Sequence, residues 1–264
     1  MTTQDFITEL FCRVDDVMPH DHQVPKHSQA NLYPSELVTL GLLYALKGKG
    51  QRAFYRWMER DCKLLFPKLP ERTRLFRALA AHQEWTRLFL ESATTLGICD
   101  SYGIELIHPM REGRTSGQLG KKGKSNHRWI VGAKVCLVLN QWGLITDWDA
   151  DTANVSDQVF QALIAQYQEQ MIVFTDTGFH AKEGDPAHMK VCPRGTWNDR
   201  MRIEGVFSML HRVCSLKHMT HRVWKHLKAH LAFALAIFNI CVQWDGFPID
   251  ENGVVHLSFA KFSL

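Results

Sequence analysis

The chain contains no pair of cysteines at C-x-x-C spacing, no internal repeat and no low-complexity tract. Its seven cysteines are odd in number and irregularly spaced, which argues against a disulfide framework or a zinc ribbon and indicates reduced thiols. The N-terminal stretch has early acidic residues and no apolar core, so no signal peptide is expected. The most apolar stretch, residues 227–244, contains Lys228 and His230, which favours a buried helix over a membrane span. These absences favour a soluble, cytoplasmic protein without a membrane partner.

The chain does have a modest excess of positive charge and a change of pattern near residue 96. Its 264 residues are 45% hydrophobic and 22% charged, as in ordinary globular proteins. The net charge of +4, with histidines neutral, is compatible with nucleic acid. Apolar residues recur at helical spacing up to residue 92, and strand-like runs follow. We therefore expect an all-helical N-terminal domain over residues 1–92 and an α/β domain over residues 93–264.

Arginines occur along the predicted helices of the N-terminal domain. One helix is expected to begin at Ser35 as its N-cap, another spans residues 51–62, and one long helix begins at about residue 71. The arginines concerned are Arg52, Arg56, Arg72, Arg74 and Arg77. Such a basic face is typical of a helix-turn-helix DNA reader, and also of a solvated surface on a helical cap. Residues 19–27 hold three histidines and one aspartate, so a structural metal and an exposed histidine-rich loop are the two interpretations there.

The second domain is expected to contain five strands. They are residues 96–107, 129–140, 144–151, 171–175 and 189–193. The fourth is a run of apolar and β-branched residues that leads directly into Asp176, with Gly178 supplying the turn. A carboxylate is therefore expected at the edge of the sheet. Ser156 and Asp157 are expected to cap the helix that precedes this strand.

A second acid, Glu204, is expected on a helix. Ile203, Phe207 and Leu210 recur at helical spacing and anchor one side of it, while Glu204 lies on a neighbouring face. A strand-end aspartate and a helix-borne glutamate supply hard oxygen ligands on rigid elements, as a divalent-metal site requires. The alternative is that Glu204 pairs with Arg200, four residues earlier, on a solvated helix face.

Two further segments are rich in cations. A glycine-rich segment after the first strand is expected to be a loop that lies along phosphates, or else a flexible solvated connector. Its cations are Arg111, Arg114, Lys121, Lys122, Lys124 and Arg128. The second segment contains Lys217 and Arg222, which are also expected to contact DNA. Arg200, on the predicted helix that carries Glu204, is the remaining cation expected to do so.

Three short segments resemble the catalytic blocks of bacterial insertion-sequence DDE transposases. They are Cys99-Asp-Ser101, Val173-Phe-Thr-Asp-Thr-Gly-Phe179 and Arg202-Ile-Glu-Gly-Val-Phe-Ser208. The order of elements also resembles the ribonuclease H-like fold, in which an acid on the central first strand lies beside the acid that ends the fourth. Asp100 occupies that first position. The last helix departs from a related branch of the family, because His211 stands where its pattern has lysine.

The resemblance implies a fold, an activity and a metal site. The implied fold is a ribonuclease H-like mixed five-stranded sheet flanked by helices. The implied activity is DNA strand cleavage at the ends of the element and strand transfer, with Asp100, Asp176 and Glu204 as ligands of two Mg²⁺ (or Mn²⁺) ions. Asp149 and Asp151 are alternatives for the first ligand. The implied partners are double-stranded DNA, as terminal inverted repeats and target, and a second copy of the chain in a homodimer assembled at the nucleoid.

Two other functions are compatible with the same residues. One is a ribonuclease H-like DNA nuclease that cuts without strand transfer, and the other is a non-catalytic, DNA-binding relic of a transposase. The three acids argue against the relic. An assay of strand joining distinguishes the remaining two.

Overall fold

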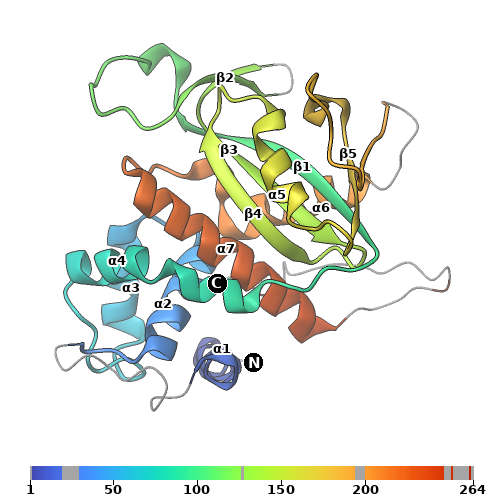
Figure 1. Cartoon of the computed structure of the whole chain (residues 1–264). Helices are drawn as coiled ribbons and strands as arrows, with labels where there is room; N and C mark the ends of the chain where they lie inside the picture. Colours follow the sequence, from blue (N-terminus) through green and yellow to red (C-terminus); the bar gives the residue numbers. More distant parts are fainter. Residues whose placement is uncertain are drawn as a thin grey trace.

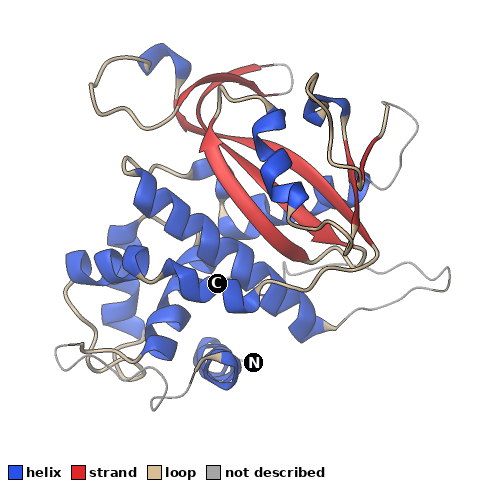
Figure 2. Cartoon of the chain, in the orientation of Figure 1, coloured by secondary structure: helices blue, strands red, loops and turns tan. Residues whose placement is uncertain are grey.

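The computed structural model describes residues 2–19, 30–125, 128–193, 200–246, 251 and 262. It shows a mixed α/β arrangement in which one sheet has helices on both faces (Figures 1 and 2). The N-terminal helices lie on the same side of the sheet as the long C-terminal helix, residues 224–245. The histidine-rich stretch predicted as a loop or metal site falls largely on residues 20–29, outside the described residues.

The N-terminal part is helical, as predicted. Its elements are α1 (Thr3–Val17), α2 (Pro34–Lys47), α3 (Gln51–Asp61), α4 (Arg72–Ala81) and the 3-10 helix η1 (Gln83–Phe89). Two local predictions are wrong. Ser35 lies inside α2, because that helix begins two residues earlier than predicted, with Tyr33 as the N-cap and Pro34 at the first position. The single long helix from residue 71 is interrupted at His82, where η1 begins and brings Phe89 into the core against α7 (Trp224–Asp245).

Helix α7 is the central support of the helical part. It contacts α2, α4 and η1, and Phe233 comes so close to α2 that a Cβ at Gly41 would lie 2.4 Å from its ring. By length and hydropathy α7 could cross a membrane, but 83% of its most apolar window is buried within the protein. The prediction of a buried helix at this point is confirmed, because α7 packs within the core.

The sheet is mixed and six-stranded. Its strands are β1 (Leu96–Ile107), β2 (Lys121–Ser125), β3 (Arg128–Asn140), β4 (Ile145–Thr152), β5 (Ile172–Thr175) and β6 (Met189–Val191). The strand order is β2-β3-β1-β5-β6, and β4 also pairs with β3. β1, β3 and β4 form antiparallel pairs, whereas β5 is parallel to β1 and β6 is parallel to β5. The five predicted strands are present, and β2 is the sixth.

The two faces of the sheet bury different residues. Ile98 and Ile104 of β1 belong to a large cluster that also includes α6 (Arg200–Cys214), α7 and the N-terminal helices. Cys99 belongs to a second cluster under the 3-10 helix η3 (Asp157–Phe160) and α5 (Gln161–Ala165). Since side chains alternate along a strand, Asp100 faces α6 and Ser101 faces α5. The fold therefore gives the candidate acid the side of the sheet on which Glu204 is carried.

Candidate metal and DNA site

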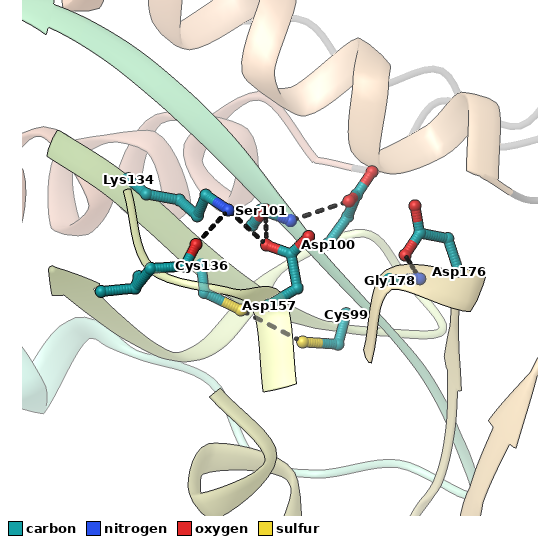
Figure 3. A network of polar contacts seen from close by, with 9 residues as sticks. Cys99, Asp100, Ser101, Lys134, Cys136, Asp157, Asp176 and Gly178 are labelled. Carbon is teal, nitrogen blue, oxygen red and sulfur yellow. Dashed lines mark hydrogen bonds and ion pairs between the residues drawn. The ribbon is translucent and has the colours of Figure 1, made fainter. Parts of the chain in front are cut away.

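Asp100 and Asp176 lie on neighbouring parallel strands at the same level. The paired residues of β1 and β5 are Leu96 with Ile172 and Ile98 with Phe174, and two more residues along each strand lead to Asp100 and Asp176. Partners in a parallel pair point to the same face, about 4.8 Å apart between backbones. Figure 3 shows both carboxylates on the same side, next to one another. The two carboxylates are therefore neighbours at this part of the sheet.

Local backbone contacts orient both carboxylates. Oδ1 of Asp100 accepts a hydrogen bond from the backbone N–H of Ser101 at 2.8 Å. Asp176 begins the 3-10 helix η4 (Thr177–Phe179), and its Oδ1 accepts from the N–H of Gly178 at 2.8 Å. Asp100 is buried, with 8% of its surface exposed, while Asp176 is partly exposed at the strand end. One acid is thus held inside the sheet and the other at its rim.

A third aspartate, Asp157, supports this site from the opposite face. Its Oδ1 accepts from Ser101 Oγ at 2.5 Å and from Lys134 Nζ at 3.0 Å (Figure 3). Lys134 also donates to the carbonyl of Val155 at 2.8 Å, and only 12% of its side chain is exposed. Asp157 therefore connects β1 to β3 through partly buried polar contacts. The prediction that it caps the following helix is wrong, because Ser156 is the N-cap residue.

The same aspartate explains the glycine in the turn after β5. A Cβ at Gly178 would lie 2.9 Å from Oδ2 of Asp157 and 3.0 Å from Oδ1 of Asp176. A side chain at position 178 would therefore push against both carboxylates. The sequence pattern assigned Gly178 to the turn alone and did not indicate the contacts among Lys134, Ser101 and Asp157, since only the fold brings these positions together.

Glu204 is on α6, as predicted, and this helix covers the face of β1 that carries Asp100. Tyr102, two residues beyond Asp100, packs against Phe207 and His211, with ring centroids 5.1 and 4.4 Å apart. Glu204 precedes Phe207 by three residues, so it shares that side of the helix. Its side chain is exposed, whereas Ile203, Leu210 and the rest of the predicted anchoring stripe are buried.

The described residues contain no group of three or more His, Cys, Asp or Glu side chains that could hold a metal ion. Asp100, Asp176 and Glu204 are thus not assembled there as a complete metal cage, and the assignment of all three as ligands stays a prediction. In donor chemistry the two strand-borne carboxylates suit Mg²⁺ or Mn²⁺, because these hard cations prefer oxygen ligands. Asp100 and Asp176 would hold such an ion, with Glu204 as the candidate on the facing helix.

The two alternative acids on β4 lie elsewhere. Asp149 is opposite Cys136 of β3, so a whole strand separates it from β1, and its Oδ1 accepts from Lys228 Nζ at 3.2 Å. Asp151 is opposite Lys134, two residues further along the strand, and accepts from the N–H of Thr152. Neither aspartate lies on the strand next to β5.

The cations expected to bind DNA fall into three groups. Arg52, Arg56, Arg74 and Arg77 are exposed and Arg72 is partly exposed on α3 and α4. Arg111, Arg114 and Arg222 line one cavity, and Lys217 is exposed on the 3-10 helix η5 (Leu216–His218). The side chain of Arg200, together with residues 194–199, lies outside the described residues. The cavity joins two segments distant in the chain, which the sequence did not indicate.

The predicted loop containing Lys121, Lys122 and Lys124 is corrected by the structure. These residues form β2, which pairs with the start of β3, from Lys121 opposite Gly132 to Ser125 opposite Arg128. All three lysines are exposed, and Lys122 Nζ lies 3.6 Å from a carboxylate oxygen of Glu112. The strand has no apolar alternation because it is an edge strand whose charges face solvent.

Comparison with known proteins gives no relative for this chain. No family model, no curated protein and no solved structure matches it. Its function is therefore inferred from the residues and geometry of the protein itself.

Proposed function

We propose that this protein is a DDE-type transposase that cleaves DNA at the ends of an insertion element and joins them to target DNA. The observation that carries the proposal is the parallel register of β1 and β5, which puts Asp100 beside Asp176 under the helix that bears Glu204. The order β4-β3-β1-β5-β6, antiparallel and then parallel, agrees with the ribonuclease H-like arrangement and supports the proposal.

The chemistry follows from what these carboxylates can do. When bound, divalent cations would neutralise charge on the phosphate and help ionise the attacking hydroxyl. Asp100 and Asp176 would hold these ions from rigid strands. Lys134 and Asp157 hold Ser101, the neighbour of Asp100, in place. In hydrolysis a water oxygen bonds to phosphorus as the P–O3′ bond breaks. In strand transfer the freed 3′-hydroxyl takes the place of water, so no protein nucleophile is required.

The first prediction concerns Asp176. Asp176→Asn should remove cleavage of supercoiled plasmid carrying the element ends in Mg²⁺, by more than the roughly 10–100-fold typical of losing an outer-shell partner. DNA binding should persist, because an amide keeps the shape of the side chain but is a weak ligand for a hard cation. Cleavage is measured by plasmid nicking and binding by gel shift.

Asp149→Asn is the matched control, since this exposed aspartate is on the same sheet but pairs with Lys228. It should cut at the wild-type rate. Wild-type cutting by Asp176→Asn, or loss of cutting by Asp149→Asn, would show that the ligand assignment is wrong.

The two alternative functions are separated by the products. Cut DNA without joined product indicates a nuclease that lacks strand transfer. DNA binding with neither cutting nor joining, in Mg²⁺ and in Mn²⁺, indicates an inactive relic. Joined product with the element's 3′ ends linked to target DNA supports the transposase.

A further inference from the structure

Two neighbouring cavities meet at the segment between α6 and α7. The first, of about 330 Å³, lies between residues 48–51 at the start of α3 and residues 219–226. The second, of about 340 Å³, lies between the end of β1 with residues 108–119 and the same segment. Thr220, His221 and Arg222 line both cavities, so the two form adjoining parts of one groove.

The groove is positively charged. Lys49 and Arg222 line the first cavity, and Arg111, Arg114 and Arg222 line the second. Among the described residues, no aspartate or glutamate lines either one. These four cations are exposed, so they can reach a ligand without leaving a buried ion pair. The charge pattern fits an anion that extends through both cavities.

Two histidines that line the first cavity have ring nitrogens without a partner among the described residues. His221 Nε2 lies 3.5 Å from the Tyr44 hydroxyl and 3.3 Å from His230 Nδ1. The other ring nitrogens, Nδ1 of His221 and Nε2 of His230, are buried and bond no atom of the described residues. His230 is only 5% exposed. Buried ring nitrogens are normally hydrogen-bonded, so these two leave unused hydrogen-bonding capacity in the wall of this cavity.

A helix terminus adds to this cavity. Gly50 is the N-cap of α3, and no side chain caps the helix. The first N–H groups of a helix have no partner within it and favour an anion. Because Gly48, Gly50 and Gln51 all line the cavity, these donors lie beside Lys49 and the two histidines.

We propose that one DNA strand crosses this groove, with phosphates of its backbone in both cavities and Arg222 contacting the strand between them. The inference rests on the proposed function for the nature of the polyanion. A strand fits better than a free phosphate, because two adjoining cavities with separate cations and a shared arginine suit successive charges on one chain. The groove joins the N-terminal helices to the sheet part, so DNA in it contacts both.

The distance between the groove and the acids sets the minimum length of a duplex that can reach both. Leu106 of β1 lines the second cavity, and Asp100 is six residues earlier on the same strand. At about 3.3 Å per residue this separation is roughly 20 Å. A duplex that reaches both places must extend about six base pairs between them, at about 3.4 Å per pair.

The test measures binding of the full-length protein to a fluorescently labelled duplex across a salt series, in EDTA so that no cleavage occurs. Lys49→Ala, Arg222→Ala and the double variant Arg111→Ala/Arg114→Ala should each weaken binding. The slope of log affinity against log salt should become shallower by about 0.9 for each phosphate that the variant no longer neutralises. Lys68→Ala, an exposed lysine that lines neither cavity, is the control and should keep the wild-type slope.

The outcomes separate this inference from the proposed function. A wild-type salt slope for Arg222→Ala overturns the proposal that one strand crosses both cavities. So does a changed slope for only one of the two other variants, Lys49→Ala and Arg111→Ala/Arg114→Ala. Displacement of the duplex by inorganic phosphate far more effectively than by chloride at equal ionic strength assigns the groove to free anions and also overturns it. A shallower slope in the groove variants supports the path even if the wild-type protein cuts no DNA. Cutting with an unchanged slope refutes the groove alone.

Discussion

Among single residues, His221 and His230, which line the groove, have the clearest consequence for stability. Burial, with a smaller contribution from the neighbouring His226, lowers the pKa of His221 to about 4. Burial also lowers the pKa of His230. Tyr44 packs on the His230 ring, and the cations Lys49 and Arg222 line the same cavity. Both imidazoles are therefore neutral in the folded protein at neutral pH.

The sign of the pH dependence follows from proton binding. Below pH 6.5, His221 is protonated in the unfolded chain. In the folded protein it stays neutral until the pH falls to about 4. Stability should therefore fall as pH drops from about 6.5 to about 4, by on the order of 2–3 kcal/mol from this residue. Urea unfolding at pH 7.5 and pH 4.5 measures the loss.

The variant His221→Gln should show a smaller loss of stability between these pH values, because glutamine does not titrate. His82→Gln, at an exposed position, is the control and should behave as the wild type. An equal loss in His221→Gln and wild type would mean that other groups cause the acid sensitivity.

At the level of elements, β2 shows how a segment that looks like a loop can be a strand. Its sequence is Lys121-Lys-Gly-Lys-Ser125, without β-branched or aromatic residues. A Cβ at Gly123 would lie 1.8 Å from the carbonyl oxygen of Ala153, so only glycine allows this strand to approach the turn after β4. Backbone pairing and close approach decide the structure here, and side-chain propensity does not.

The lysines of β2 are still expected to contact DNA. Their spacing on an exposed edge presents Lys122 and Lys124 on one face and Lys121 on the other. Changing all three to alanine should lower affinity for duplex DNA. The salt slope should fall by up to about 0.9 per lysine that contacts a phosphate.

The comparison for this triple variant is Lys63→Ala/Lys68→Ala, which removes exposed lysines between α3 and α4. Lys122 forms an ion pair with Glu112, so its contribution to DNA affinity is expected to be the smallest of the three lysines. A triple variant with the wild-type slope would show that β2 faces away from the DNA.

At the level of the whole molecule, the helical and α/β parts share one hydrophobic cluster. It runs from Phe6 and Leu10 of α1 through α7 to Ile98 and Ile145 of the sheet. The buried Asn239 of α7 strengthens this connection, because its amide donates to the carbonyls of Phe89 and Ile145 and accepts from the N–H of Ile145. The described helices of the N-terminal part thus pack against the sheet part, and the role of residues 1–92 as a DNA-end-binding unit remains a prediction.

That role can be tested by footprinting. The variant with Arg52, Arg56, Arg72, Arg74 and Arg77 changed to alanine should lose specific protection of the element ends while it keeps its fold and non-specific cutting. Arginines on helices can contact phosphates and base edges, whereas the acidic site has little means of reading sequence. The side chains are at least partly exposed, so the fold should tolerate their loss.

The competing interpretation is that this surface supports a homodimer. Light scattering of the same variant, with and without DNA, distinguishes the two. Full protection of the ends would assign recognition to residues 93–264, and loss of a dimer with the footprint retained would assign the arginines to assembly.

Local sequence was sufficient to predict the secondary structure around the acids. A run of β-branched and apolar residues must be buried, so it ends in Asp176 at the sheet's rim, and the helical spacing of Ile203 and Leu210 places Glu204 on an exposed helix side. Such assignments need only the periodicity of one segment. The same reasoning identified α7 as a core helix, because Lys228 and His230 interrupt its apolar run.

Which of these positions meet depends on the fold of the whole chain. The register of β1 with β5 brings Asp100 beside Asp176, and the support from Lys134 and Asp157 comes from residues 23 positions apart. The groove at Arg222 likewise depends on contacts between segments distant in sequence. Such contacts form because one shared core aligns the strands and helices, and the local pattern of a single segment carries no information about its distant neighbours.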